Sequence, residues 1–427
     1  MVLMAKIYIE TYGCTLNQSD SDILKALLAD RHTLTESEEN SDVIIINTCT
    51  VKEATENRIM ARIRGIHQKG RKLVIAGCLS VNEHKIRRNA PLSPIVAPSS
   101  LDRILDAIGD ALAGRVTTYK TPADKANLPR LLGAPIARIP ISEGCTSACF
   151  FCQTKFARPY LRSYSPKTIV RWINEAVKAG AKEIQLTSTD SGAYGIDLKT
   201  NLVSLMELIA NDDSSTRAGG EFFVRLGMIN PDHAMRMLPG IIRMLKHPRF
   251  YKFLHIPVQT GSEKVCREMN RDHTVKNFVD IVEAVRKEIP DIAISTDIIV
   301  GYPTESEDDY RQTIEMLEQV RPDVTNVSKF SPRPGTKAKE LKVLHSSIVK
   351  KRSEEASALV HKISEESRKR FIGRTSRVLV TEKQRDFKAR DVNYRQVVIK
   401  RFKGKLGDMV NVRIADANRG SFFGEQE

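Results

Sequence analysis

The sequence has no apolar run near the roughly 20 residues that a helix needs to cross a bilayer, so a membrane-spanning protein is not expected. It also lacks, at its start, the basic segment, apolar middle and small-residue cleavage site of a secretory signal. Its seven cysteines are an odd number, which does not suit a disulfide framework. Together these absences predict a cytoplasmic chain whose cysteines bind metal.

The chain is too long, at 427 residues, for one hydrophobic core and fits two or three domains. Its net charge is +15, and the last 91 residues carry +11 of it, whereas residues 1–115 are nearly neutral. A basic surface at one end predicts a bound polyanion such as nucleic acid. The alternative is a solvated basic tail.

The first 115 residues alternate short apolar segments with amphipathic ones, which predicts a parallel sheet covered by helices. A cysteine follows each of three predicted strands: Cys14 follows Lys6–Glu10, Cys49 follows Val43–Ile46, and Cys78 follows Leu73–Ala76. Because the carboxyl ends of parallel strands meet at one edge, where such folds bind ligands, we expect the three thiols to share a site. The alternative is three unrelated cysteines buried as small apolar side chains.

A second alternation of strands and helices begins after residues 116–135, which are rich in proline, lysine and small residues and are predicted to be a linker. Six strand–helix units indicate a complete or partial parallel barrel with its chemistry in the carboxyl-edge loops. Its strands are expected at Ala137–Ile141, Glu183–Thr187, Phe222–Leu226, Phe253–Val258, Ile292–Val300 and Val324–Phe330. One of the helical patterns between them is at Ala234–Lys246.

The C-terminal part of the chain changes character twice. Residues 337–370 are charged and helical in pattern, and from Phe371 onward short β-rich runs indicate a small antiparallel barrel of the OB type. That last segment carries +6, so its basic residues are expected to contact phosphates. Phe402, Phe422 and Phe423 would either stack on a base or fill the barrel core.

The strongest signal is the triplet of Cys145, Cys149 and Cys152, in a loop directly after the first predicted barrel strand. Three thiolates at this spacing can hold three irons of a [4Fe–4S] cluster and leave the fourth iron open. Zinc is the competing metal, but a structural zinc site takes four ligands and no nearby His or Cys supplies the fourth. The spacing therefore favours an iron–sulfur cluster. Cys266, which has no cysteine neighbour in its helical stretch, is expected to be structural.

This Cys-x3-Cys-x2-Cys loop resembles that of the radical S-adenosylmethionine (SAM) superfamily. The resemblance implies that the open iron binds the amino and carboxylate groups of SAM, and that Phe151 packs near its adenine. It also implies that one electron, delivered through the cluster, cleaves SAM to a 5′-deoxyadenosyl radical, while the barrel positions and shields the cofactor.

Nearly the whole chain resembles the methylthiotransferase family within that superfamily. The motifs that carry the resemblance are TYGCTLNQSDS at Thr11–Ser21, NTCTV at Asn47–Val51, AGC at Ala76–Cys78, HIPVQTGS at His255–Ser262, MNRDHT at Met269–Thr274, TDIIVGYPTE at Thr296–Glu305 and SPRPGT at Ser331–Thr336. Leu186–Gly195 and Arg225–Pro231 are similar to the archaeal and eukaryotic, MtaB-type branch, which acts on N6-threonylcarbamoyladenosine in tRNA. The chain ends without the membrane anchor of eukaryotic members, so an archaeal-like soluble form is expected.

The resemblance implies an α/β fold with a Rossmann-like parallel N-terminal domain, a partial (β/α)6 radical SAM barrel and a small C-terminal antiparallel barrel of the TRAM type. The expected boundaries are 1–115 for the N-terminal domain, 116–135 for the linker, 136–336 for the barrel, 337–370 for the helical connection and 371–427 for the TRAM domain.

The resemblance also assigns roles to residues. Cys14, Cys49 and Cys78 would hold an auxiliary [4Fe–4S] cluster that carries the sulfur, and the second triplet would hold the cluster that cleaves SAM. One SAM would methylate the sulfur, and the radical from a second would activate the C2–H bond of adenine. Contacts to SAM are expected from Phe151, Thr187, Ser188, Asp190, Arg225, His255, Gln259 and Ile299. The expected partners are tRNA and a flavodoxin- or ferredoxin-like electron donor, and the chain is expected to be a monomer.

Other substrates remain open within the family: adenosine with an isopentenyl or hydroxynorvalylcarbamoyl group, or an aspartate of a ribosomal protein. A rival from another class is a non-catalytic RNA-binding protein with a degenerate cluster. The two intact cysteine triplets argue against that rival.

Overall fold

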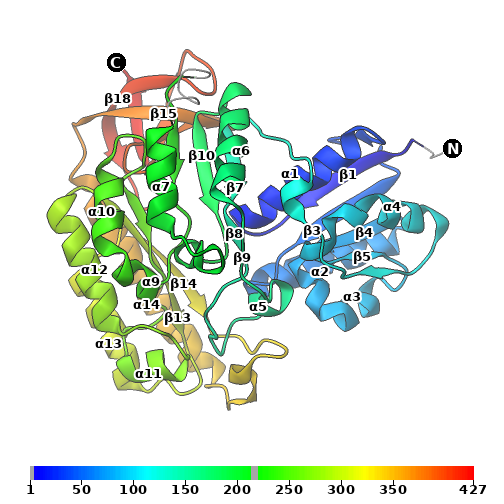
Figure 1. Cartoon of the computed structure of the whole chain (residues 1–427). Helices are drawn as coiled ribbons and strands as arrows, with labels where there is room; N and C mark the ends of the chain where they lie inside the picture. The colour runs from blue at the N-terminus through cyan, green and yellow to red at the C-terminus, as the bar shows by residue number, and fades with distance from the viewer. Residues whose placement is uncertain (1–3, 213–219) are drawn as a thin grey trace.

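The computed structural model describes residues 4–212 and 220–427 of the chain. It contains, in sequence order, a six-stranded parallel sheet, two three-stranded parallel sheets and a closed five-stranded barrel (Figure 1). The α/β fold predicted from the sequence is confirmed. Within the part of the chain that is described, no helix combines the length and the apolar character needed to span a membrane.

The N-terminal sheet has the strand order β2-β1-β3-β4-β5-β6, and all its strands are parallel. The strands are β1 (Lys6–Thr11), β2 (Thr33–Leu34), β3 (Val43–Thr48), β4 (Lys72–Gly77), β5 (Ile95–Val96) and β6 (Thr118–Tyr119). The helices are α1 (Thr15–Ala29), α2 (Glu53–Gln68), α3 (Glu83–Asn89) and α4 (Ile104–Ala113).

Strand β3 lies at the centre of this sheet, and all six of its residues are buried. Its side chains alternate between two cores because successive residues of a strand point to opposite faces. Val43 and Ile45 pack with α1 and α4, whereas Ile44 and Ile46 pack with α2 and α3. Burial on both faces explains why β3 reads as a continuous apolar run.

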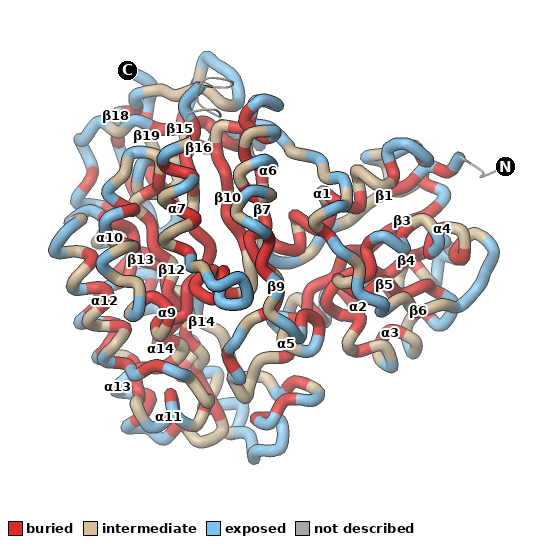
Figure 2. Tube along the Cα trace, viewed as in Figure 1, coloured by how far each residue is buried: buried red, intermediate tan, exposed pale blue. Residues whose placement is uncertain are grey.

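The middle of the chain forms two half-barrels with strand orders β7-β10-β11 and β12-β13-β14, again all parallel. The strands are β7 (Ile136–Pro140), β10 (Glu183–Thr187), β11 (Phe223–Arg225), β12 (Phe253–His255), β13 (Ala293–Val300) and β14 (Val324–Lys329). The covering helices are α6 (Pro166–Lys178), α7 (Leu202–Asn211), α9 (Pro231–Arg236), α10 (Leu238–Lys246), α11 (Glu263–Glu268), α12 (Val275–Glu288), α13 (Glu307–Val320) and α14 (Ser346–Lys369). Figure 2 shows these strands, except β14, as largely buried beneath the helices, whereas the residues of β14 are exposed or intermediate.

The helical pattern expected over Ala234–Lys246 is divided into two helices in the structure. Helix α9 begins at Pro231, and α10 begins at Leu238 with Pro239 in its first turn. Proline has no backbone N–H and clashes with the preceding turn, so it breaks a helix in its interior and is tolerated at the start.

The C-terminal strands form a closed barrel in the order β15-β16-β17-β19-β18. They are β15 (Thr375–Lys383), β16 (Phe387–Asp391), β17 (Gln396–Ile399), β18 (Met409–Ala417) and β19 (Phe422–Gln426). The pairing is antiparallel except between β17 and β19, which are parallel. The sequence predicted an antiparallel barrel, but five strands cannot alternate in direction around a closed ring, so one parallel pair is required.

Tyr394, in the turn between β16 and β17, inserts at the amino end of the middle barrel. Its hydroxyl lies 3.1 Å from Glu183 Oε1 and 3.0 Å from Gln185 Nε2, both on β10. Its ring packs against Tyr251 and Phe253, with ring centroids 4.9 and 5.1 Å away. The C-terminal barrel is thereby attached to the end of the middle barrel opposite the cysteine-bearing loops.

Candidate functional site

The first cysteine trio (Cys14, Cys49 and Cys78) lies at the carboxyl edge of the N-terminal sheet. The three residues follow β1, β3 and β4, which are neighbours in the sheet. Burial raises the pKa of the Cys78 thiol to about 12; nearby Arg158 opposes this rise, and Cys14 and Cys49 add to it. The mutual effect of the three thiols agrees with the shared site inferred from the strand ends.

Asn17, on the first turn of α1, ties the loops of this trio together. Its Nδ2 donates to the carbonyls of Tyr12 and Thr48, both at 2.7 Å, and its Oδ1 lies 3.7 Å from the Cys78 Sγ. Asn47 Nδ2 in turn donates to the Asn17 carbonyl at 2.8 Å. Both asparagines are almost fully buried, so these amides fix the loop backbones around the thiols.

Two glycines allow the cysteine loops to approach each other closely. Gly13 has a φ of +108°, and a Cβ added there would lie 2.7 Å from the Cys49 Cβ. Gly77 has a φ of +93°, and its Cβ would lie 2.4 Å from Asn47 Oδ1. Both positions require glycine, because other residues are strained at positive φ and have no room here.

The second cysteine trio (Cys145, Cys149 and Cys152) lies in the loop after β7 and the short strand β8 (Ser142–Glu143). The backbone turns back within this loop, with the Cys152 N–H donating to the Cys149 carbonyl at 3.2 Å. Burial, with a smaller contribution from Asp190, raises the pKa of the Cys145 thiol to about 11.

Asp190 is fully buried and organises the polar side of this loop. Its carboxylate accepts hydrogen bonds from the Asn230 Nδ2 at 2.7 Å and from the His233 Nδ1 at 2.8 Å, and it lies 3.9 Å from the Cys145 Sγ. Burial opposes protonation of His233, but the hydrogen bond to Asp190 outweighs it and raises the pKa of that imidazole. Thr187 and Ser188 lie at the same strand end, where Ser188 Oγ is 2.9 Å from Ser191 Oγ.

Arg271 is a site residue that the sequence reasoning missed. Its Nη1 donates to the Cys149 Sγ at 3.1 Å, and its Nη2 donates to Asn230 Oδ1 at 2.9 Å. A half-buried guanidinium at this position would compensate the negative charge of a thiolate. Arg271 lies in Met269–Thr274 and Asn230 lies in Arg225–Pro231, two of the segments that carry the family resemblance. These motifs could therefore have identified both residues.

Phe151 and Ile299 lie in one apolar group beside the second trio. They pack with Met269, Tyr302 and Phe330. Gln259 continues this wall through its backbone, because its carbonyl accepts from the Ile299 N–H at 2.8 Å. A flat apolar surface next to polar groups is the setting that an adenine base needs.

His255 and Asp297 form a pair on β12 and β13, with 2.8 Å between His255 Nε2 and Asp297 Oδ2. Burial opposes ionisation of Asp297, but His255 outweighs it and lowers the pKa of that carboxyl. Arg225 lies elsewhere: its guanidinium packs over the rings of Phe253 and Tyr394, 5.3 and 5.6 Å from their centroids. The structure therefore does not bring Arg225 to the other candidate SAM contacts.

Four charged side chains, of which Asp20, Lys125 and Arg158 are buried and Glu143 is partly exposed, connect the N-terminal sheet to the barrel. Lys125, in the segment between them, lies 2.8 Å from Asp20 Oδ1 and 2.6 Å from Glu143 Oε1. Arg158 pairs with Asp20 and lies 3.1 Å from Glu143 Oε2. We call these four residues the buried ion cluster. It fixes α1 against the loop that carries the second trio.

The donor chemistry of the two trios suits iron–sulfur clusters. Among residues 4–212 and 220–427, no three His, Cys, Asp or Glu side chains have the spacing that holds a single metal ion. That finding concerns mononuclear sites, whereas thiolates around a [4Fe–4S] cube bind different irons. Cys266 belongs to neither trio, and its thiol donates to the His273 carbonyl at 3.2 Å.

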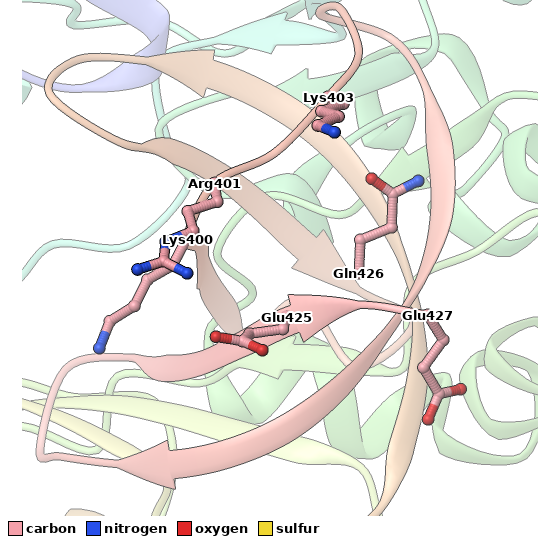
Figure 3. Close-up of a pocket in the computed structure, with 6 residues that line it drawn as sticks. All are labelled: Lys400, Arg401, Lys403, Glu425, Gln426 and Glu427. Carbon is pink, nitrogen blue, oxygen red and sulfur yellow. The ribbon is translucent and has the colours of Figure 1, made fainter.

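The basic trio (Lys400, Arg401 and Lys403) lines a shallow hollow on the C-terminal barrel (Figure 3). Glu425 and Glu427 line the same hollow, so its charge is mixed. Phe402 packs against Phe387 with ring centroids 5.0 Å apart, and Phe422 is buried in the barrel core. These two rings have structural positions.

Comparison with known families and structures agrees with this architecture. The Radical SAM superfamily model matches residues 139–317, and the model described as Uncharacterized protein family UPF0004 matches residues 6–96. Among solved structures, the radical S-adenosylmethionine methyltransferase TsrM from Kitasatospora setae has a TM-score of 0.57 at 11% identity, covering 79% of this chain and 77% of that one. At this identity the likeness shows the fold alone.

Three curated relatives align over almost the whole chain. A probable threonylcarbamoyladenosine tRNA methylthiotransferase of Archaeoglobus fulgidus is 42% identical over 98% of both chains. One of the same name from Pyrococcus horikoshii is 39% identical over 99% of both. The threonylcarbamoyladenosine tRNA methylthiotransferase of Drosophila melanogaster is 32% identical over 98% of this chain and 77% of its own. The chain therefore belongs to the family of threonylcarbamoyladenosine tRNA methylthiotransferases, within the radical SAM superfamily.

Proposed function

We propose that this protein attaches a methylthio group to carbon 2 of N6-threonylcarbamoyladenosine, next to the anticodon of tRNA. The observation that carries the proposal is the presence of two cysteine trios, one on each of two adjoining α/β units, whose loops touch through Thr50 and Gln153. One trio suffices to cleave SAM, so a second trio beside it needs a second task, and transfer of sulfur is that task.

Each trio would hold a [4Fe–4S] cluster with one iron open to an outside ligand. With SAM bound, these groups supply the radical and the sulfur, and the protein supplies their placement. Asn17 orients the loops of the first trio, while Asp190, Asn230 and Arg271 hold the loop of the second. Asn17, Asp190 and Asn230 are buried, so they would also keep water from the reacting groups.

For SAM itself we propose contacts from seven candidate residues at the carboxyl ends of the barrel strands and in the loops that follow them. These are Phe151, Thr187, Ser188, Asp190, His255, Gln259 and Ile299. Phe151 and Ile299 would contact the adenine, and the polar residues would contact the ribose and the methionine moiety. Arg225 is left out, because its guanidinium packs on Phe253 and Tyr394 at the other end of the barrel.

The domain roles follow the same division. Residues 1–115 would carry the auxiliary cluster, 116–135 would link it to the SAM-cleaving barrel of 136–336, and 337–370 would connect to a tRNA-binding TRAM domain at 371–427. The tRNA substrate implies a cytoplasmic enzyme. A small flavodoxin- or ferredoxin-like protein would donate the electron to a monomeric enzyme.

Mass spectrometry of tRNA nucleosides from a strain that lacks the gene tests the function. We expect the 2-methylthio form of N6-threonylcarbamoyladenosine to vanish and its precursor to accumulate. The wild-type gene should restore it, and Cys78→Ala and Cys145→Ala variants should not. Loss of a different methylthiolated adenosine, or of a modified aspartate in a ribosomal protein, would contradict the proposal and name the alternative substrate.

A further inference from the structure

A buried hydrogen bond joins the loops of the two cysteine trios. Thr50 directly follows Cys49, and Gln153 directly follows Cys152. The Thr50 hydroxyl lies 2.6 Å from Gln153 Oε1, although the two residues are 103 positions apart in the sequence. Both side chains are almost fully buried, at 1% and 3% exposure, so water cannot replace this bond.

The Nε2 of the Gln153 side-chain amide reaches the loop that begins at Cys78. Its Nε2 donates to Asn82 Oδ1 at 2.9 Å and to the Pro334 carbonyl at 3.3 Å. Asn82 ends the helical turn that starts at Cys78, and it is also buried. One amide therefore spans the loops of Cys49, Cys78 and Cys152, and each of its polar atoms has a partner.

Arg333 fixes the direction of the Thr50 hydroxyl. Its Nη2 donates to the Thr50 carbonyl at 2.7 Å and to the Thr50 Oγ1 at 2.9 Å, and it forms an ion pair with Glu56 on α2. Since the hydroxyl oxygen accepts from Arg333, its own proton is left for Gln153. A buried guanidinium paired in this way holds one geometry, because any other leaves a charge without partners.

Attachment of the N-terminal sheet to the barrel does not depend on this hydrogen bond. The buried ion cluster joins the same two parts through α1 and Lys125, and it shares no residue with the Thr50–Gln153–Asn82 chain. The buried ion cluster holds the two parts together, so the hydrogen bonds among Thr50, Gln153 and Asn82 are not needed for attachment and can serve to position the two trios. Its members adjoin the cysteines themselves, where a small displacement changes how the two trios face each other.

We propose that Thr50 and Gln153 are positioning residues that set the separation and orientation of the two trios, so that the groups held by them reach one adenosine. The inference rests on the proposed function and adds to it the residues that couple SAM cleavage to sulfur transfer. Reacting groups displaced by about 1 Å can lose about a hundredfold in rate. Loss of the hydrogen bond should therefore leave SAM cleavage in place while it lowers the transfer of sulfur to the adenosine.

The test uses reconstituted full-length protein and an anticodon stem-loop containing N6-threonylcarbamoyladenosine. Thr50→Val keeps the shape and removes the hydroxyl, Gln153→Leu removes all three hydrogen bonds of the side-chain amide, and Thr50→Ser keeps a hydroxyl as the matched control. For the first two we expect methylthiolated product to fall about 10- to 100-fold while 5′-deoxyadenosine release changes less than about threefold. Thr50→Ser should keep the wild-type ratio of the two.

A second readout needs no RNA. The magnetic interaction between the two reduced clusters, measured by electron paramagnetic resonance, should change in Thr50→Val and Gln153→Leu with the iron content unchanged. Product and 5′-deoxyadenosine falling in parallel, iron lost together with product, or an unchanged spectrum and ratio would each overturn the proposal. If the wild-type enzyme leaves the RNA unmodified, the proposed function fails, and the spectrum still decides the positioning role.

Discussion

Two aspartates on the same helix are expected to have opposite effects on stability. Asp20 and Asp22 both lie on α1, at its contact with the barrel. Asp20 accepts hydrogen bonds from Lys125 and Arg158, whose positive charges outweigh its burial and lower its pKa. Asp22 lies 3.9 Å from Arg138, and burial outweighs the charges of Arg138, Lys25 and Arg130 and raises the pKa of Asp22 to about 6.

The magnitudes follow from these environments. Asp20→Asn leaves Lys125 and Arg158 with Glu143 as their carboxylate in the buried ion cluster, and removal of one partner from a buried pair costs about 3–5 kcal/mol. For Asp22, a pKa raised from 3.8 to about 6 disfavours the folded state by up to about 3 kcal/mol at pH 7. Asp22→Asn should therefore stabilise the protein by that amount or less.

The dependence on pH separates the two effects. The folded state binds the proton of Asp22 more strongly than the unfolded state does. The stabilisation of the folded state by protonated Asp22 is therefore present below about pH 4 and is lost as the pH rises through about 6. The gain from Asp22→Asn should be full at pH 7 and vanish near pH 4. The pKa of Asp20 is lowered, so the loss from Asp20→Asn should persist at both pH values.

Calorimetry of the metal-free protein at pH 7 and pH 4.5 measures both effects, and the rate of proteolysis within residues 116–135 reports on the junction. Asp20→Asn should speed this cleavage, because it removes one of the two carboxylates that hold Lys125. The reasoning is refuted if Asp20→Asn costs less than about 1 kcal/mol, the value of an exposed ion pair, or if both variants shift stability in the same direction at pH 7.

Three further outcomes are expected. Gly13→Ala places a Cβ 2.7 Å from that of Cys49, so iron after reconstitution should fall from about eight to about four atoms per chain; a full complement would show that the loop adapts. Tyr394→Phe removes the hydrogen bonds of the hydroxyl to β10 and should lower the free energy of unfolding by about 1–2 kcal/mol in calorimetry, and an unchanged value would deny them a stabilising role. Exchange of the basic trio for glutamine should weaken tRNA binding and flatten its salt dependence, by about one in log–log slope for each phosphate that the protein no longer binds; an unaltered slope would place the RNA elsewhere.

The sequence was sufficient to predict the fold and the positions of the cysteines, because both depend on local pattern. Alternating strands and helices imply a parallel sheet, and a parallel sheet brings Cys14, Cys49 and Cys78 to one edge whatever their separation. The break at Pro239 was also readable, since proline carries a fixed local cost.

The contacts between the two α/β units could not be predicted. Thr50 contacts Gln153 across 103 residues of sequence, and Arg333 contacts Glu56 across 277. The local sequence around these residues does not indicate which partner each one contacts. Arg225 shows the same limit within the barrel. The pattern places it on an inward-facing position of β11, but only the insertion of Tyr394 decides that its guanidinium packs at the amino end.

The insertion of Tyr394 covers the amino end of the middle barrel. Glu183, Phe223 and Phe253, which begin β10, β11 and β12, are buried at this end, where Phe223 and Phe253 pack with Leu379 and Met409 of the C-terminal barrel. A nucleoside that reaches the second trio would therefore enter and leave on the side of the cysteine loops. The base would have to turn out of the anticodon loop to reach the reacting groups. The modified RNA would then be released by the route through which the base entered.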